Sequence, residues 1–154
     1  MGIEIERKFL VKDESWRAFA RGKKYCQGYL SSNKERTVRI RTTGNRGYLT
    51  IKGIANGAVR VEYEYEIPVD EAWAMLDALC EKPLIEKSRY KIEHRGLLWE
   101  VDEFYGENQG LIIAEVELDF KDQKFEKPEW IGDEVTGDSK YFNSNLIHHP
   151  YNQW

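Results

Sequence analysis

Most of the chain alternates between apolar and polar residues with a period of two, the pattern of strands that bury one face. Residues 3–11 show it most clearly, with glutamates at 4 and 6 opposite isoleucines at 3 and 5. The pattern predicts eight strands, over residues 3–11, 25–31, 37–43, 48–52, 59–67, 85–93, 97–105 and 111–120. Helical patterns predict three helices, over residues 13–21, from Asp70 to about Cys80, and over 142–148.

Short turn signals separate several of these strands. Residues 44–47 (Gly-Asn-Arg-Gly) and the pair Asn56-Gly57 are typical of hairpin turns. Strands joined by hairpins pair antiparallel, and a closed sheet leaves no free edge. We therefore predict a mainly β member of the α+β class, an eight-stranded antiparallel closed β-barrel with a few peripheral helices. Without any linker or repeat, residues 1–154 are expected to form a single domain.

Composition excludes several classes of protein. The 154 residues are 41% hydrophobic, which is enough for a core, and no apolar run approaches the ~20 residues of a membrane helix. The N-terminus is charged from residue 4, unlike a secretory signal. Against 23 basic residues stand 27 acidic ones, a net charge of -4 that argues against a nucleic-acid partner. We expect a protein with no membrane or nucleic-acid partner.

Scarce residue types exclude further chemistry. Cys26 and Cys80 have no metal-binding spacing and form no CxxC pair, which fits a reducing cytoplasm. His94 is the only histidine before the pair near the C-terminus, so zinc-protease and Ser-His-Asp chemistry have little support. The chain also has no GxxxxGK[ST] or GxGxxG motif for a nucleotide.

Like charges recur two residues apart within the predicted strands, where side chains lie on one face roughly 6.5 Å apart. The pairs are Glu4 and Glu6, Arg39 and Arg41, Glu62 and Glu64, Lys87 and Arg89, Glu100 and Asp102, and Glu115 and Glu117. A solvated outer face is the simpler interpretation, but such a face usually mixes signs because like charges repel. Inside a barrel, the carboxylates could hold a hard divalent cation and the bases could hold phosphates.

At these positions the chain resembles the CYTH-domain proteins, the triphosphate tunnel metalloenzymes. Eight short motifs of that family recur in order: Glu4-x-Glu6-x-Lys8, Arg39-x-Arg41, Leu49-Thr50-Ile51-Lys52, Arg60-x-Glu62-x-Glu64, Lys87-x-Arg89-Tyr90, Glu100-x-Asp102, Glu115-x-Glu117 and Asp138-x-Lys140-Tyr141-x-Asn143. The last motif has lysine where the family has arginine. The start of the chain looks especially like the short bacterial members.

The resemblance implies a role for each matching position. It implies metal binding by Glu4, Glu6, Glu115 and Glu117, with Mg²⁺ or Mn²⁺ as cofactor, and makes Glu62, Glu64 and Asp102 either further metal ligands or partners of the ligands. It implies phosphate binding by Lys8, Arg39, Arg41, Lys52, Lys87 and Arg89, and for Arg60 either a phosphate contact or the orientation of a lumen carboxylate. Of these, it implies that Glu4, Glu6 and Lys8 are catalytic, together with Lys140 near the attacked phosphorus, in a segment that closes one tunnel mouth.

The implied activity is metal-dependent hydrolysis of a small triphosphate, with inorganic tripolyphosphate as the first choice. Adenylate cyclase chemistry and thiamine triphosphate hydrolysis are the alternatives within the family. Tyr29, Tyr48 and Phe104 share the lumen-facing parity and are candidates for stacking on a thiazolium ring. An alternative of another class is a polyphosphate- or nucleotide-binding module without turnover. Oligomeric state does not follow from the sequence.

Overall fold

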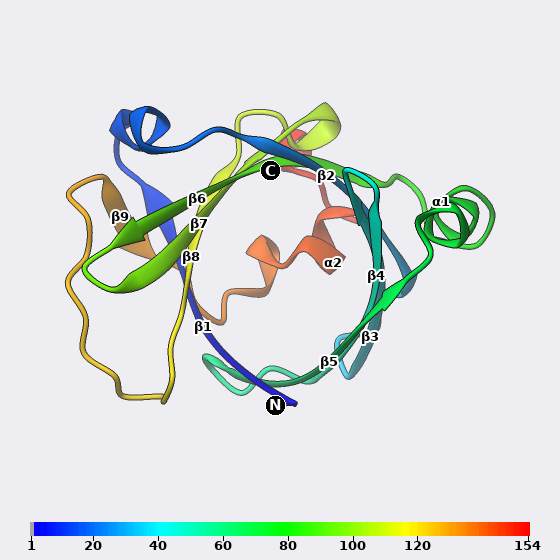
Figure 1. The fold of residues 1–154 in the computed structure, drawn as a ribbon, viewed down its shortest axis with the longest axis horizontal. Coiled ribbons are helices and arrows are strands. Elements are labelled where there is room, and N and C mark those ends of the chain that lie inside the picture. The colour runs from blue at the N-terminus through cyan, green and yellow to red at the C-terminus, as the bar shows by residue number, and fades with distance from the viewer. Residues whose placement is uncertain (1) are drawn as a thin grey trace.

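A computed structural model describes residues 2–154, and its main feature is a closed antiparallel barrel (Figure 1). The strands are β1 (Ile3–Val11), β2 (Lys23–Ser31), β3 (Arg36–Thr43), β4 (Arg46–Gly53), β5 (Val59–Ile67), β6 (Ile85–His94), β7 (Leu97–Phe104), β8 (Ile112–Glu117) and β9 (Ile131–Glu134). Their order is β5-β4-β3-β2-β6-β7-β8-β1-β9, and a further pairing of β5 with β1 closes the ring. The predicted eight-stranded barrel is confirmed, and β9 is an additional strand that the sequence pattern did not predict.

Hairpin turns form where the sequence predicts them. Gly44 and Gly57 adopt φ values of +57° and +62°, a left-handed conformation that glycine adopts without steric cost. The strands that they join pair in continuous register, for example Arg39 with Thr50 across β3 and β4. Because side chains alternate along each strand, this register keeps all the charged positions of one parity on the inner face of the barrel.

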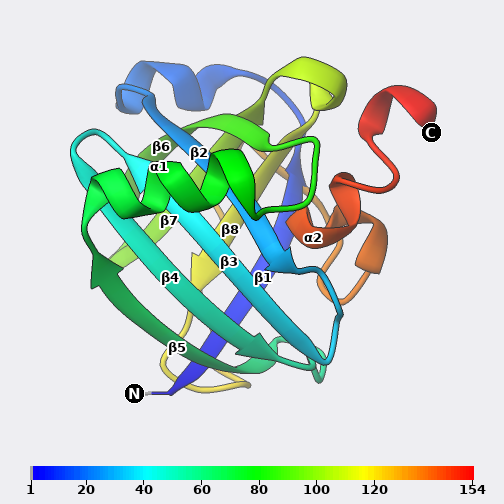
Figure 2. The same cartoon turned by 90° about the vertical axis from the view of Figure 1, so that its right-hand side faces the viewer.

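Helix α1 (Val69–Ala78) lies on the outside of the barrel across β3 and β4 (Figure 2). It buries Ala72 and Leu76 against Ile40 of β3. The sequence pattern predicts the start of this helix at Asp70, as the residue that caps it; the helix instead begins at Val69, after Pro68, and no side chain caps it. Asp70 lies in the first helical turn instead, where a negative charge interacts favourably with the helix dipole.

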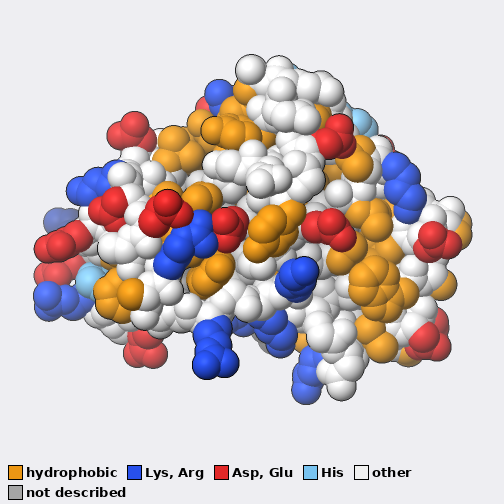
Figure 3. Space-filling view, turned by 90° about the horizontal axis from the view of Figure 1, so that it is seen from above, with side chains coloured by type: hydrophobic (Ala, Val, Ile, Leu, Met, Phe, Trp, Pro, Cys, Tyr) orange, Lys and Arg blue, Asp and Glu red, His pale blue; other side chains and the backbone are white. Residues whose placement is uncertain are grey.

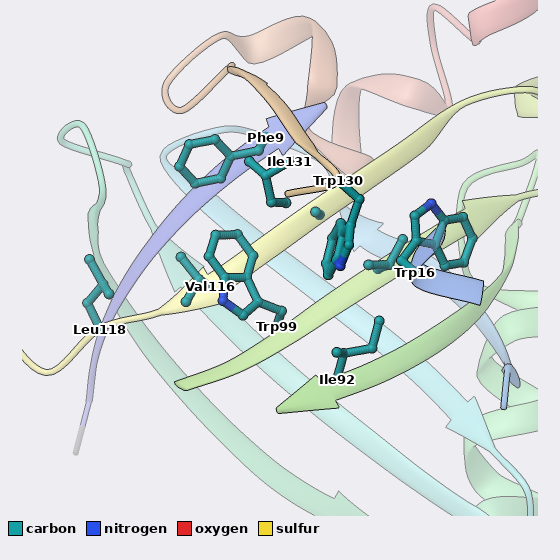
Figure 4. Packing of buried hydrophobic residues seen from close by; sticks show 10 residues of the cluster. Phe9, Trp16, Ile92, Trp99, Val116, Leu118, Trp130 and Ile131 are labelled. Atoms are coloured by element: carbon teal, nitrogen blue, oxygen red, sulfur yellow. The ribbon is translucent and has the colours of Figure 1, made fainter. Parts of the chain in front are cut away.

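A second apolar cluster covers the outer faces of β6, β7, β8 and β1. Phe9, Trp99 and Trp130 lie at its centre, and the Phe9 and Trp99 rings are 5.5 Å apart (Figure 4). The predicted helix over 13–21 is a shorter 3-10 helix, Ser15–Phe19, which buries Trp16 in the same cluster. Strand β9 contributes Ile131. The outward-facing side chains of this half therefore form much of the hydrophobic core.

One end of the barrel is filled by the C-terminal segment. A 3-10 helix (Ser139–Tyr141) leads into α2 (Asn143–Leu146), which lies inside the ring of strands (Figure 1). Its residues pack on the inner ends of β2, β6, β7 and β8 in a cluster of Tyr29, Ile85, Phe104, Leu111, Ile113, Tyr141, Leu146 and Ile147. Two further 3-10 helices are Gly106–Asn108 and Tyr151–Gln153. None of the helices described in residues 2–154 has the length and apolar character needed to cross a membrane.

Candidate active site

The inner face of the barrel encloses a cavity of about 220 Å³ that is lined almost entirely by charged side chains. Its seven bases are Lys8, Arg39, Arg41, Lys52, Arg60, Lys87 and Arg89. Its seven acids are Glu4, Glu6, Glu62, Glu64, Glu100, Glu115 and Glu117. All the residues that the sequence places in the site line this cavity, apart from Asp102 and Lys140. Because acids and bases are equal in number, the cavity suits an anion bound together with a cation better than either ion alone.

Acids and bases are unevenly distributed around the wall, in an acidic arc and a basic arc, but ion pairs also join the two kinds of side chain. Lys8 lies 3.4 Å from Glu115. Arg39 and Arg41 lie 3.5 Å and 3.3 Å from Glu64. Strands β8 and β1 carry glutamates, while β3 carries the two arginines and β6 carries the Lys87 and Arg89 pair. The ring order sets β8 opposite β3 and β5 opposite β6. A cation on the carboxylates would therefore face phosphates held by the opposite arc.

Carboxylates of the acidic arc lie close enough to share protons. Burial raises the pKa of Glu6 well above its usual value, and the nearby charges of Glu115 and Glu4 add to the effect. Burial, and then a hydrogen bond with Glu4, raise the pKa of Glu62 to about 7. The Lys52 ammonium lies 3.2 Å from carboxylate oxygens of both Glu4 and Glu62. The arc thus carries more negative charge than its own bases offset.

Arginines of the basic arc keep donors free for an anion. Arg39 and Arg41 each bury an Nε–H that has no acceptor. Burial, followed by the charges of Arg39 and Arg89, lowers the pKa of Arg41 to about 10. The Arg41 guanidinium lies 5.1 Å from the ring centre of Tyr25 and 5.6 Å from that of Tyr48, which fixes its plane. Buried donors without acceptors are costly, and phosphate oxygens are the acceptors that guanidinium groups fit best.

Asp102 holds two of the bases from behind. Its carboxylate accepts hydrogen bonds from Arg89 Nε at 2.8 Å and Nη2 at 2.9 Å, and lies 2.9 Å from Lys87 Nζ. Burial lowers the pKa of Lys87 to about 8, although Asp102 opposes the change. Asp102 is almost fully buried and does not line the cavity. Of the two roles that the resemblance left open for Asp102, this geometry favours that of a supporting residue, which positions Lys87 and Arg89, over that of a direct metal ligand.

Comparison with known proteins places this architecture in a family. A model of the CYTH domain matches residues 2–151. The chain belongs to the CYTH domain family. The resemblance noted in the sequence motifs is thereby confirmed, and so is the mainly β tunnel fold that it implied. Dependence on a metal belongs to this family of triphosphate tunnel metalloenzymes.

Several CYTH proteins are similar over nearly their whole length. An inorganic triphosphatase of Acetivibrio thermocellus is 55% identical over 151 residues, which cover 98% of this chain and 97% of that protein. An inorganic triphosphatase of Nitrosomonas europaea is 37% identical over 151 residues, or 93% of this chain and 95% of that protein. A crystal structure of an inorganic triphosphatase, 34% identical, superposes with a TM-score of 0.66 over 93% of this chain and 96% of that one.

The carboxylates of this CYTH domain fit a hard divalent cation in their chemistry. Oxygen ligands are those that Mg²⁺ and Mn²⁺ prefer. Burial first, and then the charges of Glu115 and Glu4, raise the pKa of Glu6, and a bound cation would offset both effects. In residues 2–154, however, no three acidic, histidine or cysteine side chains converge tightly enough to form a ready-made metal site. The Lys52 ammonium lies between Glu4 and Glu62, so metal binding requires Lys52 to turn toward the phosphates.

The C-terminal motif of the CYTH domain reaches the cavity through Asn143 rather than Lys140. Asn143 Oδ1 accepts hydrogen bonds from Lys87 Nζ at 2.9 Å and from Gln27 Nε2 at 3.1 Å. The Lys140 ammonium instead lies 4.4 Å from the ring centre of Trp154 and is exposed. Phe142, Asn143 and Ser144 line the cavity, whereas Lys140 does not. The geometry therefore does not support the catalytic role suggested for Lys140.

Replacing Lys140 by alanine is expected to leave tripolyphosphate hydrolysis within about threefold of wild type, because an exposed cation outside the cavity contributes little. Replacing Asn143 by alanine is the matched comparison within the same motif, and a larger loss of kcat is expected. Initial rates of phosphate release measure both effects. A loss above a hundredfold for the Lys140 variant would instead mean that the C-terminal segment rearranges when substrate binds and brings Lys140 into the cavity.

Residues that carry no charge were missed by the sequence reasoning. Gln27 is fully buried beside the cavity and joins Tyr29 to Asn143 through its amide. Thr37 and Phe142 line the cavity, and the Phe142 ring lies within 6 Å of both Lys8 and Arg60. Lumen-facing parity within β2 and β3 was the available signal for Gln27 and Thr37. No comparable signal existed for Phe142, because the irregular C-terminal segment has no period.

Proposed function

We propose that this chain hydrolyses inorganic tripolyphosphate to pyrophosphate and phosphate, with Mg²⁺ or Mn²⁺ as the cofactor. The observation that carries the proposal is the pair of buried, unpaired Nε–H donors of Arg39 and Arg41 in a cavity where seven bases face carboxylates. A polyanion bound with its cation would satisfy both arcs at once. The names of the two whole-length relatives, both inorganic triphosphatases, support the same activity.

In the proposed reaction a water molecule attacks the terminal phosphorus in line with the bond to the leaving pyrophosphate. When bound, the divalent cation neutralises phosphate charge and acts as a Lewis acid. Glu6, with its raised pKa, orients the water and accepts its proton. Arg39, Arg41 and Lys8 donate hydrogen bonds to oxygens on which charge develops. Glu6 takes the proton of the attacking water, pyrophosphate leaves, and no covalent intermediate forms.

The size and lining of the cavity favour a substrate without a base or ring system. At about 220 Å³ it is smaller than the ~300–1,000 Å³ of typical small-molecule sites. Of the predicted stacking residues, Tyr29 lines the cavity but is 3% exposed, while Phe104 is buried in the C-terminal cluster and Tyr48 packs against Arg41. This lowers the support for thiamine triphosphate.

Similarity to cyclase-related proteins is more distant. A Hippeastrum protein studied as an adenylyl cyclase, with a dominant triphosphatase activity, is 16% identical with a TM-score of 0.60 over 76% of this chain and 80% of that one. At that identity the likeness shows a common fold alone. The cavity is small and lined mostly by charged side chains, so it favours a bare phosphate chain over ATP, and cyclase chemistry remains the less favoured alternative.

A substrate panel tests the proposal. Purified protein is incubated with tripolyphosphate, ATP, thiamine triphosphate or pyrophosphate, each with magnesium, manganese or calcium, and released phosphate is measured. We expect tripolyphosphate with magnesium or manganese to give the highest kcat/KM, and pyrophosphate to accumulate as a product. Thermal stabilisation by tripolyphosphate without phosphate release under every metal would favour a binding module instead.

The proposal also covers the domain organisation, the partners and the location of the protein. Residues 1–154 are proposed to act as one catalytic domain, supported by a CYTH match over 2–151. The substrate is a small molecule, and no nucleic-acid or membrane partner is proposed. A cytoplasmic location is proposed because Cys26 and Cys80 are both free thiols.

A further inference from the structure

The outer face of β4 and β5 carries no charged side chain, although 32% of the chain is charged. The outward positions of β5 are Val59, Val61, Tyr63, Tyr65 and Ile67, and those of β4 are Gly47, Leu49, Ile51 and Gly53. The inward positions of β5, in contrast, hold an arginine and three glutamates. A barrel face exposed to water would normally place polar residues there.

These outward side chains form one contiguous exposed patch. Val61 pairs with Ile3 of β1, and Tyr63 pairs with Ile51 of β4, so the patch crosses three neighbouring strands. We call this patch, made of Ile3, Ile51, Val61, Tyr63 and Tyr65, the β5 face. Ile3 is 61% exposed, Tyr63 51% and Tyr65 56%. Such large exposed apolar side chains in a group mark an interaction surface.

Within residues 2–154, no element lies outside β5 (Figure 1), whereas α1 covers β3 and part of β4 and the tryptophan cluster covers the opposite half. On the surface seen from above, acidic and basic side chains lie between the apolar areas (Figure 3), whereas the outward positions of β4 and β5 hold no charged side chain. The β5 face therefore differs from the rest of the surface in being both apolar and uncovered.

The extent of the patch matches one half of a symmetric interface. Two half-exposed tyrosines and three aliphatic side chains offer apolar surface on the order of 500 Å² per copy. Together with their rim, two such faces reach the ~1,200 Å² at which specific interfaces begin. Homodimer interfaces are also the more apolar class, and tyrosine is enriched in them.

Charges at the two ends of the patch are complementary under a two-fold rotation. Arg36 lies beside the Val61 end, because it pairs with Gly53 across β3 and β4. Asp70 and Glu71, in the first turn of α1, follow directly after Ile67 at the other end. A two-fold axis across the strands through Tyr63 reverses the strand direction. It brings Arg36 of one copy toward the acidic end of the other.

We propose that the β5 face joins two copies of this chain in a two-fold symmetric dimer, with the two β5 strands antiparallel across the interface. Isologous contacts of this kind are self-complementary, so every residue of the patch meets the same patch. The two sheets pack face to face at the angle of about 30° that twisted sheets favour. No residue of the β5 face lines the cavity, so dimerisation and catalysis are separable.

Sedimentation equilibrium tests the dimer directly. Wild-type protein at tens of micromolar is expected to give twice the chain mass of 18.2 kDa. The double variant Tyr63→Glu/Tyr65→Glu is expected to give the monomer mass with tripolyphosphatase activity retained. Leu79→Glu, at an exposed apolar position beyond α1, is the matched control and should remain dimeric. A monomeric wild type, or a dimeric double variant, overturns the proposal.

Two further variants test the geometry. Because the two-fold axis passes Tyr63, Tyr63→Cys is expected to form an intermolecular disulfide on mild oxidation, whereas Leu79→Cys is not. Arg36→Glu is expected to weaken the dimer at least tenfold, and addition of Asp70→Lys and Glu71→Lys to restore it. A dimer that persists without Tyr63 crosslinking, and without response to these charge reversals, means that a different surface is used. Far-ultraviolet circular dichroism shows that each variant is folded.

Discussion

Replacing Glu6 by glutamine is expected to lower kcat for tripolyphosphate by at least about a thousandfold while making the fold more stable. The two effects have one cause. Glu6 is held among other carboxylates, where burial and the charges of Glu115 and Glu4 raise its pKa well above its usual value. Its ionised form is the one proposed to bind the metal and take a proton from water. Ionisation therefore serves the reaction and opposes folding.

The direction of the pH dependence follows from this shift. A carboxyl whose pKa is higher in the folded state binds more protons there than in the unfolded chain. Its contribution to stability is present at low pH and is lost as the pH rises above the unfolded value of about 4.5. The glutamine variant has no such loss. Its advantage in Tm over wild type is expected to grow between pH 5 and neutral pH.

Activity assays and thermal melts in metal-free buffer measure the two effects. Glutamine keeps the size of the side chain and can still donate a hydrogen bond to Glu115, so a packing defect is not expected. Glu66→Gln is the matched control, because Glu66 has the same parity on β5 but does not line the cavity. Retention of a tenth of the wild-type rate by the Glu6 variant would contradict the assigned role.

Much of this site could be predicted because strand parity is a local property. A residue two positions from Glu4 must point the same way, so pairs of like charge identify a face before any pairing is known. The barrel then follows, because only closure turns such faces toward each other. Alternation alone does not show which set of residues faces the lumen. The family motifs identified that set.

Strand parity predicts neither how deep a side chain lies behind the cavity wall nor the orientation of residues in irregular segments. Asp102 has the lumen-facing parity, yet it lies behind Lys87 and Arg89, because those longer side chains extend past it toward the cavity. Lys140 and Asn143 belong to a segment of 3-10 turns without a regular period, so spacing could not show which of them faces inward. Strand β9 spans only Ile131–Glu134, too short for an alternating pattern to be distinct.

Replacing Asp102 by alanine is expected to destabilise the fold by about 3–5 kcal/mol, because it removes the only carboxylate in residues 2–154 paired with buried Lys87 and the nearer of the two paired with Arg89. Asp102 is 1% exposed and pairs with both Lys87 and Arg89 within 3 Å. For a domain of this size, that loss corresponds to a fall in Tm of roughly 10 °C. Thermal unfolding in metal-free buffer at neutral pH measures it.

Glu103→Ala is the adjacent control. Glu103 faces outward and pairs with Arg17, and its side chain is 25% exposed. Exposed pairs contribute about 1 kcal/mol or less, so the loss in this variant should be small. A similar loss in both variants would mean that the strand, and not the buried charge, is responsible.

The same substitution should change how the protein responds to its ligand. Without Asp102, Lys87 has no carboxylate partner among the residues that the structure describes and Arg89 keeps only Glu100, at 3.4 Å, until phosphate oxygens provide further acceptors. Tripolyphosphate is therefore expected to raise the Tm of the Asp102 variant by more than it raises that of wild type, through preferential binding to the folded state. If the two shifts are equal, Lys87 and Arg89 do not contact the phosphate chain. In that case phosphate binding and the stability of the protein without ligand depend on different residues, and only Arg39 and Arg41 of the basic arc bind phosphate.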